Sequence, residues 1–462
     1  MLALFAALSL DPLFSAPTLR GAHVGALVVS ADSGRVLYAR DADDAFIPAS
    51  TMKLIVGSVA LDELGNAFSF GTTLSIDGTT LYLRGGGDPT LQPSDLDEAA
   101  TAAKALAQPR FVGELDADDT HYSITRYHDG WQVDDLPYDY AAPVSALGLA
   151  DNVLHIAIHP ADTAGSPATF TVQPDDANLQ IENDATTGAA HSADTTALQI
   201  AWSYPNTIRI TGSVPLDAPS LLDAAMLDPT GVVLDTFGQS LSRAGIVAAS
   251  TGRAPTPPGA RVLWQHHSAA LSQLLASMWQ PSDNLIAETL LDELGSAADG
   301  DSRANGIARE IAWLKTLGVD PQTLTIADGS GMSAYDRVTP SALVAILAHD
   351  WNGAGRDVVM AALPQPGKPG TLDHAFAGTP LVGHLFAKTG TVNHTRTLAG
   401  YLQTAHGTVI FALLVNDWID PAPDAASNLR SFQQAFLEGI LRDAPDNAQT
   451  HPNGRRRRSE SI

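Results

Sequence analysis

The residues best suited to carry chemistry begin with a serine and a lysine three positions apart, Ser50 and Lys53, in the stretch PASTMKLIV. Positions i and i+3 share one face of a helix, so a helix starting here would place the hydroxyl beside the amine. A serine hydroxyl is a weak nucleophile until a base takes its proton. Lysine is such a base only when neutral, and burial or a nearby cation such as Lys388 lowers its pKa. The helix N-terminus also offers N–H groups to a developing oxyanion.

A second motif, Ser282-Asp283-Asn284, precedes an apolar run with helical spacing. Ser282 is suited to pass a proton to a leaving amine. The Asn284 amide can both donate to and accept from a substrate peptide.

A third motif, Lys388-Thr389-Gly390, lies at the end of a strand-like run. Lys388 and Thr389 are suited to hold a carboxylate, and Gly390 allows a substrate backbone to approach closely. The N–H group of Thr391 is then placed for a second contact with an oxyanion.

The combination is more informative than any one motif. By itself, Ser50 would be interpreted as a helix cap, and S-x-x-K alone is a weak signal. Two of the chain's five lysines, however, fall within the motifs. S-x-x-K, S-D-N and K-T-G in this order are the signature of class A β-lactamases and penicillin-binding proteins. The set therefore predicts acyl transfer through a serine ester.

The composition excludes several other classes of function. Among 462 residues there are 26 basic and 51 acidic ones, a formal charge of −25. Such a chain repels phosphate backbones, so nucleic acid is not an expected partner. The absence of cysteine excludes disulfides, thiolate metal sites and a cysteine nucleophile. The histidines at 266, 267 and 394 lack metal-ligand spacing, so neither a metal nor a cofactor is predicted.

Neither end of the sequence predicts a membrane anchor. Residues 1–10 are apolar but too short to span a bilayer, and they lack a basic n-region and a cleavage site. We interpret them as part of a first helix that ends near residues 17–22, with the export signal missing from this sequence. Residues 444–462 are predicted to be a disordered tail, and its arginines, Arg455–Arg458, are interpreted as solvated rather than bound to envelope polymers. Oligomeric state is not predicted.

The hydrophobic pattern predicts an α/β (α+β) fold whose first and last parts form one domain, residues 1–67 and 262–443. A hairpin at 25–43 and a helix at 50–65 are followed, from 262 onward, by helices, then strands, then a closing helix at 427–442. Residues 68–261 are rich in Gly, Pro, Asp and Thr and show short alternating strands, with helices expected only around 97–107 and 218–227. We predict a β-rich insert of one or two small domains.

Beyond the three motifs, whole segments resemble one family. These are the low-molecular-mass penicillin-binding proteins of the PBP4 type, the D-alanyl-D-alanine carboxypeptidase/endopeptidases of peptidase family S13. The similar segments are LYLRGGGDPTL, WQVDDLPYDYAAPVSAL, DNVLHIAIHP, ADGSGMSAYDRVTP and GHLFAKTGTVNHTRTLAGYL. The likeness covers about residues 8–442, and the long gap between Lys53 and Ser282 is typical of this family rather than of class A β-lactamases. It implies a β-lactamase/transpeptidase-like domain, an antiparallel sheet with flanking helices, interrupted by the insert.

The resemblance also implies residue roles. Ser50 would be the acylated nucleophile and Lys53 its base, and Ser282 and Asn284 would form the second catalytic element. Lys388 and Thr389 would bind the terminal carboxylate. The N–H groups of Ser50 and Thr391 would form the oxyanion hole.

The resemblance implies a side-chain pocket as well. An aspartate and an aromatic residue of the insert would recognise a diaminopimelate-type side chain, and the alignment of WQVDDLPYDY suggests Asp135 and Tyr140. Relatives often contribute an arginine to this pocket where the present chain has Ala334. Arg337, three residues on, is the candidate substitute.

The expected function is a periplasmic or extracytoplasmic D-alanyl-D-alanine carboxypeptidase/endopeptidase that acts on peptidoglycan stem peptides and is acylated by β-lactams at Ser50. A β-lactamase or esterase with the same triad, and a non-catalytic envelope-binding protein, are the alternatives. The first would turn penicillin over rapidly, and the second would form no adduct.

Overall fold

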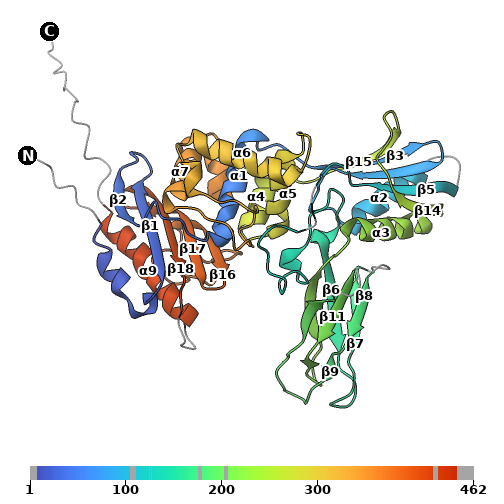
Figure 1. Ribbon diagram of the computed structural model, residues 1–462, viewed down its shortest axis with the longest axis horizontal. Helices are drawn as coiled ribbons and strands as arrows, with labels where there is room; N and C mark the ends of the chain where they lie inside the picture. The colour runs from blue at the N-terminus through green and yellow to red at the C-terminus, as the bar shows by residue number, and fades with distance from the viewer. Residues whose placement is uncertain are drawn as a thin grey trace, which may run out of the picture.

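The computed structural model describes residues 8–104, 111–123, 125, 127–174, 179–201, 206–419 and 425–444 (Figure 1). Residues 1–7 of the predicted first helix and residues 445–462 of the predicted tail lie outside these ranges. Between residues 11 and 19 the chain forms two short 3-10 turns, η1 Asp11–Ser15 and η2 Pro17–Leu19, where the helix was expected to end.

A five-stranded antiparallel sheet carries the K-T-G motif at its edge, and its strand order is β16-β17-β18-β1-β2. The first strand pairs with the last, His23 opposite Asn416, so strands from both parts of the chain build one sheet. The strands are β1 His23–Ser30, β2 Val36–Arg40, β16 Leu385–Val392, β17 Thr395–Thr404 and β18 Gly407–Asn416.

Alternating side chains cover the two faces of this sheet with different cores. In β18, Ile410, Ala412 and Leu414 face a layer of helices, whereas Phe411 and Leu413 face α9 Ala425–Asp443 and the two N-terminal turns. Figure 1 shows α9 on one side of the sheet and the helical layer on the other.

The helical layer encloses α1, the helix that begins at Lys53. Residues Lys53–Leu61 are all buried, which explains the nearly continuous apolar run. A Cβ atom on Gly57 would lie 2.5 Å from the Trp279 ring, so glycine lets α4 pack directly on α1. The layer comprises α1 Lys53–Glu63, α4 Leu271–Trp279, α5 Asn284–Gly295, α6 Ser302–Thr316, α7 Pro340–Asn352, α8 Arg356–Ala362, η3 Ala49–Met52 and η6 Pro321–Thr323.

The chain between these parts contains two further groups of sheets, at the other end of the view in Figure 1. The first is a mixed five-stranded sheet of order β14-β5-β4-β3-β15 that packs against α2 and α3 around Leu83, Leu115 and Phe237. Its elements are β3 Gly71–Asp77, β4 Thr80–Gly85, α2 Pro93–Lys104, β5 Phe111–Asp118, α3 Pro229–Arg243, β14 Val247–Arg253 and β15 Arg261–His267.

The second group consists of small sheets around a separate core that includes Leu154, Ile156 and Ile208. Their strand orders are β13-β6-β7, β10-β11-β8 and β12-β9. The elements are η4 Asp139–Ala141, η5 Ala150–Asn152, β6 Val153–His159, β7 Thr169–Gln173, β8 Gln180–Asn183, β9 Thr186–Thr187, β10 Ala197–Ile200, β11 Thr207–Thr211, β12 Ser213–Val214 and β13 Ser220–Ala225.

The predicted fold class is confirmed, but two details of the insert differ from the prediction. The sheet of β3 and β4 continues through β15 to His267, because β15 pairs antiparallel with β3 past the expected boundary at 261. The helix expected at 218–227 is wrong: residues 220–225 form β13, which pairs with β6. The helix begins later, at α3, where Asp228 caps it by accepting from Gly231 N and Pro229 occupies the first turn.

Across the part of the chain that is described, no helix combines the length and apolar character needed to cross a bilayer.

Candidate active site

Ser50 lies in the tight turn η3 that leads into α1, rather than at a helix cap. Ala49 has a φ of 47°, a strained conformation for a residue with a side chain, and no side-chain cap bond forms at either helix start. Met52 and Lys53 follow as buried residues, so the start of α1 is fixed from inside. Within this turn the Lys53 Nζ atom lies 3.1 Å from Ser50 Oγ, the pairing that the spacing predicts.

The Lys53 amine has three oxygen neighbours. Besides Ser50 Oγ, it contacts Asn284 Oδ1 at 2.6 Å and the Ser330 carbonyl oxygen at 2.8 Å. A neutral amine has two N–H groups and one lone pair. The two carbonyl oxygens can only accept, so they take both N–H groups and leave the lone pair facing the Ser50 hydroxyl. This arrangement is what a general base for Ser50 requires.

Burial also brings the Lys53 pKa toward the value that a base needs. The side chain has no solvent exposure, and desolvation lowers its pKa from 10.5 to about 8, against the opposing charges of Glu288, Asp328 and Asp283. The sequence predicts that Lys388 lowers the Lys53 pKa, but Lys388 is not among the causes of this shift. Instead, burial first and then the charge of Lys53 hold the Lys388 pKa well below its usual range.

The S-D-N motif turns the chain into α5. Ser282 has a φ of 73°, and the Asp283 carboxylate caps the helix by accepting from Ile286 N at 2.7 Å. Asn284 starts the helix and donates its Nδ2 to the Tyr140 carbonyl oxygen at 2.7 Å, while its Oδ1 accepts from Lys53. The Asn284 amide therefore links the insert to the lysine.

The K-T-G motif faces Ser282 from the edge strand β16. Lys388 is fully buried and donates from Nζ to Ser282 Oγ at 2.9 Å and to its own neighbour's carbonyl, Thr389 O, at 2.9 Å. The Thr389 hydroxyl donates to Thr371 Oγ1 at 2.8 Å. These contacts bring the second and third motifs together beside Ser50.

Gly390 lines the cavity, and it is also required by the packing of β16. A Cβ atom there would lie 2.1 Å from Thr397 Oγ1, 2.8 Å from the Pro48 carbonyl oxygen and 3.0 Å from Ser50 N. Only glycine therefore allows β16 to lie against the turn that holds Ser50.

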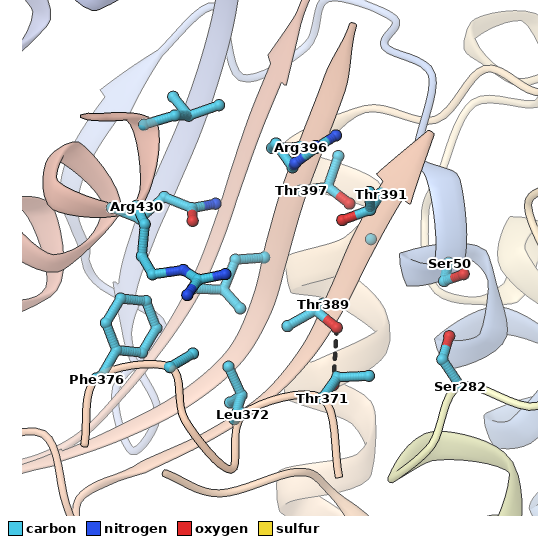
Figure 2. Close-up of a pocket in the computed structure, with 15 residues that line it drawn as sticks. Ser50, Ser282, Thr371, Leu372, Phe376, Thr389, Thr391, Arg396, Thr397 and Arg430 are labelled. Atoms are coloured by element: carbon cyan, nitrogen blue, oxygen red, sulfur yellow. Dashed lines mark hydrogen bonds between the residues drawn. The ribbon is translucent and has the colours of Figure 1, made fainter. Parts of the chain in front are cut away.

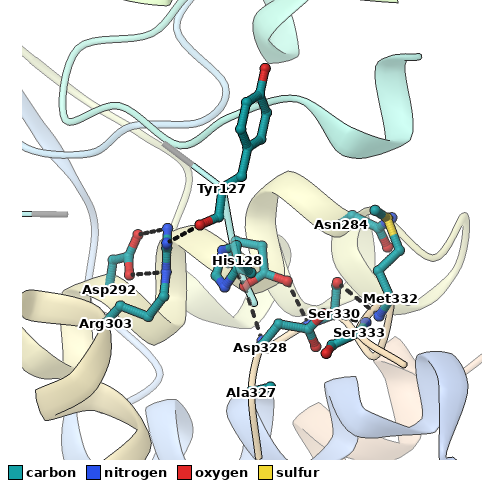
Figure 3. Close-up of polar contacts among 12 residues, drawn as sticks. Tyr127, His128, Asn284, Asp292, Arg303, Ala327, Asp328, Ser330, Met332 and Ser333 are labelled. Carbon is teal, nitrogen blue, oxygen red and sulfur yellow. Dashed lines mark hydrogen bonds and ion pairs between the residues drawn. The ribbon is translucent and has the colours of Figure 1, made fainter. Parts of the chain in front are cut away.

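A loop between residues 328 and 333 supplies the Ser330 carbonyl and is held by buried carboxylates (Figure 3). Glu288 accepts from Ser330 N at 2.8 Å and from Gly329 N at 3.0 Å. Asp328 accepts from Gly331 N and Ser333 N, both at 2.7 Å. Residues 328–331 form a tight turn, and the backbone oxygen of Ser330 is part of the site.

Residues of the insert pack against this loop. Trp131 donates from Nε1 to Asp328 Oδ2 at 2.8 Å, and His128 stacks on the Trp131 ring with centroids 4.8 Å apart. The buried His128 Nε2 lies 3.1 Å from Glu288 Oε2, without the geometry of a hydrogen bond.

The residues expected to form the side-chain pocket lie in two places. Tyr140 donates its hydroxyl to Asp135 Oδ1 at 3.0 Å, and the residue as a whole is 43% exposed. Arg337 donates instead to the carbonyl oxygens of Ala334 and Asp336, at 2.9 and 2.6 Å. Its membership of the pocket stays a prediction.

A cavity of about 340 Å³ opens beside Ser50 (Figure 2). Ser50 and Ser282 line one side, and Thr389 and Thr391 line the strand edge. Within the described ranges, no group of three or more His, Asp or Glu side chains is arranged to hold a metal ion.

Comparison with known proteins identifies the family. A sequence profile of the D-Ala-D-Ala carboxypeptidase 3 (S13) family matches residues 6–436. The chain belongs to this family. A D-alanyl-D-alanine carboxypeptidase of Actinomadura sp. (strain R39) is 34% identical over 465 residues, covering 95% of this chain and 86% of the relative.

The S13 fold is also seen in solved structures. Penicillin binding protein 4 of Haemophilus influenzae superposes with a TM-score of 0.84 at 21% identity, covering 94% of this chain and 99% of that one. The same protein complexed with a β-lactam gives a TM-score of 0.79 at 20% identity.

Sequence reasoning missed several groups in this S13 site. The Ser330 carbonyl is a backbone atom, which no side-chain motif can reveal. Glu288 had a usable signal, an acidic residue inside the apolar stretch LIAETLL and one turn after Asn284. Thr371, from the loop before β16, had none.

Proposed function

We propose that the protein is a serine D-alanyl-D-alanine carboxypeptidase, with endopeptidase capacity, that acts on peptidoglycan stem peptides through a Ser50 acyl-enzyme. The observation that carries the proposal is the set of contacts at Lys53 Nζ. Asn284 Oδ1 and Ser330 O accept the two amine hydrogens, and the lone pair faces Ser50 Oγ. Family membership agrees with this chemistry.

Acylation follows from the positions of the three motifs. The terminal carboxylate of the peptide docks at Lys388 and Thr389, which places the preceding carbonyl carbon over Ser50. Ser50 Oγ forms a bond to that carbon while its proton moves to Lys53 Nζ. The N–H groups of Ser50 and Thr391 stabilise the oxyanion.

Collapse of the intermediate breaks the carbon–nitrogen bond. Ser282, hydrogen-bonded to Lys388 Nζ at 2.9 Å, passes a proton to the leaving nitrogen. Lys388 Nζ replaces the proton that Ser282 gives, and Lys388 in turn receives the proton that Lys53 took from Ser50. Lys53 is then neutral again. Water then attacks the ester, and Lys53 takes the water proton and returns one to Ser50 Oγ.

The identity of the leaving amine distinguishes the activities. A leaving D-alanine is carboxypeptidase chemistry, and a leaving cross-bridge amine is endopeptidase chemistry. Because these peptides lie outside the cytoplasmic membrane, the proposed location is periplasmic or extracytoplasmic. Asp135 and Tyr140, joined at 3.0 Å, are the proposed recognition pair for a diamino acid side chain on the acyl donor.

Penicillin is the sharpest probe of the proposal. The Haemophilus influenzae relative in this fold binds a β-lactam. Opening the lactam ring on Ser50 adds the mass of one penicillin molecule with nothing lost. Intact-mass analysis should show that increment in the wild type and in Ser33→Ala, an exposed control in the turn between β1 and β2, and not in Ser50→Ala.

The alternatives predict different results in the same experiment. Rapid conversion of penicillin to its hydrolysed form, with no lasting adduct, would indicate a β-lactamase. No adduct and no hydrolysis would indicate a non-catalytic binding protein. A parallel assay of D-alanine release from a pentapeptide ending in D-Ala-D-Ala measures the proposed activity directly.

A further inference from the structure

The active-site cavity continues past the carboxylate-binding strand toward α9, further than a departing alanine requires. From Thr389 and Thr391 it extends to Arg396 on β17 and to Arg430 and Gln433 on α9. An alanine adds only a methyl group and a carboxylate to the leaving nitrogen, so most of the roughly 340 Å³ would stay unfilled. Figure 2 shows the Arg430 side chain reaching from α9 into this space, on the side where Thr389 lies.

Two arginines from different elements, Arg396 on β17 and Arg430 on α9, line this part of the cavity. Arg396 is anchored, since it donates to the carbonyl oxygens of Val392 and Thr395 at 3.1 and 2.8 Å. Burial and the charge of Arg430 lower the Arg396 pKa, so the two cations repel each other. Neither forms an ion pair with a carboxylate among the described residues, although the chain carries a net charge of −25. An anion in the cavity would relieve this repulsion.

The face of α9 that borders the cavity is suited to a carboxylate. Arg430 and Gln433 are three residues apart and share one face of the helix. A guanidinium binds a carboxylate with two parallel N–H donors, and a neighbouring amide adds a third. Arg430 is exposed and forms no hydrogen bond with another described residue, so its donors are available to a ligand.

The position of this end of the cavity determines what could reach it. In the proposed reaction, the terminal carboxylate lies at Lys388 and Thr389 and belongs to the leaving amino acid. Anything beyond Thr389 must therefore be attached to that amino acid, as its side chain.

We infer that Arg430, with Gln433 and Arg396, forms a subsite for a second carboxylate carried on the side chain of the leaving amino acid. This inference rests on the proposed function and deepens it. A cross-linked peptide fits, because its leaving amine belongs to a diamino acid whose near carboxylate takes the terminal position and whose far end carries the second carboxylate. A leaving D-alanine has no group that reaches Arg430.

The test compares two substrates in one pair of variants. Arg430→Gln removes the charge at the cavity, and Arg442→Gln removes the same charge near the C-terminal end of the same helix, where Arg442 pairs with Asp443. The substrates are a pentapeptide monomer ending in D-Ala-D-Ala and a cross-linked dimer with a free second carboxylate on its leaving diamino acid. Penicillin acylation of each variant reports whether the site is intact.

We expect Arg430→Gln to lower kcat/KM for the dimer about 10-fold, as for a charged hydrogen bond moderated by solvent, and to change monomer hydrolysis less than about 2-fold. Arg442→Gln should behave as wild type on both substrates. A dimer whose second carboxylate is amidated should be cleaved more slowly by the wild type, and Arg430→Gln should not slow it further.

Three results would overturn the subsite while leaving the proposed function intact. They are equal losses on monomer and dimer, which would place Arg430 at the terminal carboxylate; an unchanged dimer rate; and an amidated dimer that remains sensitive to Arg430→Gln. A wild type that is not acylated by penicillin and releases no D-alanine would overturn the proposed function and the subsite together.

Discussion

Asn284 Oδ1 lies 2.6 Å from Lys53 Nζ, a shorter contact than those that the amine makes with Ser50 and Ser330. The two residues are more than two hundred positions apart, and a neutral amide is the group that joins them. A neutral acceptor satisfies an N–H of the amine without stabilising its positive charge as a carboxylate would. Asparagine at this position therefore favours the neutral form of Lys53, whereas aspartate would favour the charged form.

Replacement of Asn284 by aspartate should test this directly. A carboxylate at 2.6 Å favours the charged amine and raises the Lys53 pKa above its value of about 8. We expect penicillin acylation at pH 7 to fall by about 10-fold or more, with partial recovery as the pH rises. Asn352→Asp, at the exposed end of α7, adds the same charge far from the site and should acylate normally. Equal rates in Asn284→Asp and wild type from pH 6 to pH 9 would contradict the argument.

The pH dependence of the wild type should follow Lys53. Only the neutral amine accepts the Ser50 proton, and the pKa of that amine is about 8 because the side chain is buried. Acylation should therefore rise about 10-fold per pH unit below pH 8 and level off above it. Rates of penicillin acylation measured by intact mass over short times would give the profile. A flat profile between pH 6 and pH 9 would mean that Lys53 is not the base.

Glu288 should act as a positioning residue for the same amine. It accepts from Ser330 N and Gly329 N, and so orients the loop whose Ser330 carbonyl meets Lys53. Among the charges that raise the Lys53 pKa, that of Glu288 has the largest effect. Glu288→Gln keeps the shape, but its NH2 group cannot accept one of the two backbone N–H bonds. We expect acylation to slow about 10-fold, as for one lost charged hydrogen bond, and the rising limb of the pH profile to move to lower pH.

The matched control for Glu288→Gln lies on the same helix. Glu293 contacts His121 and the Tyr122 hydroxyl instead of the loop. Glu293→Gln should leave both the rate and the profile unchanged. If Glu288→Gln slows acylation but leaves the pH profile unshifted, then Glu288 positions the loop but does not raise the Lys53 pKa.

The sequence predicted the site to the extent that its chemistry lies in side chains. Lys53 lies beside Ser50, and Lys388 lies 2.9 Å from Ser282 Oγ, because a turn and a strand edge convert short spacings into contacts. The central sheet was predictable because its inner strands are buried on both faces by two cores and therefore form continuous apolar runs. Backbone groups were not predictable, since the carbonyl of Ser330 would be the same in any residue.

The insert was harder to predict because its contacts are distant in sequence. The SLLDAA composition of strand β13 suits a helix as well as a strand, and pairing with β6 decides between them. The packing of Gly390 against the turn that holds Ser50 could not be inferred either. Its close neighbours, Pro48 and Thr397, come from elements that only the fold brings together.

The insert should affect substrate choice without affecting acylation by penicillin. Tyr140 and Asp135 are joined at 3.0 Å, and the Tyr140 carbonyl oxygen accepts from Asn284, so this pair lies next to the Asn284 amide that contacts Lys53. A carboxylate beside an exposed ring suits the ammonium group of a diamino acid side chain. Asp135→Asn should lower kcat/KM about 10-fold for peptides with a free side-chain amine, and should not change hydrolysis of the acetylated peptide. The neighbouring exposed Asp134→Asn is the control, and equal losses in the two variants, or on both peptides, would remove Asp135 from the pocket.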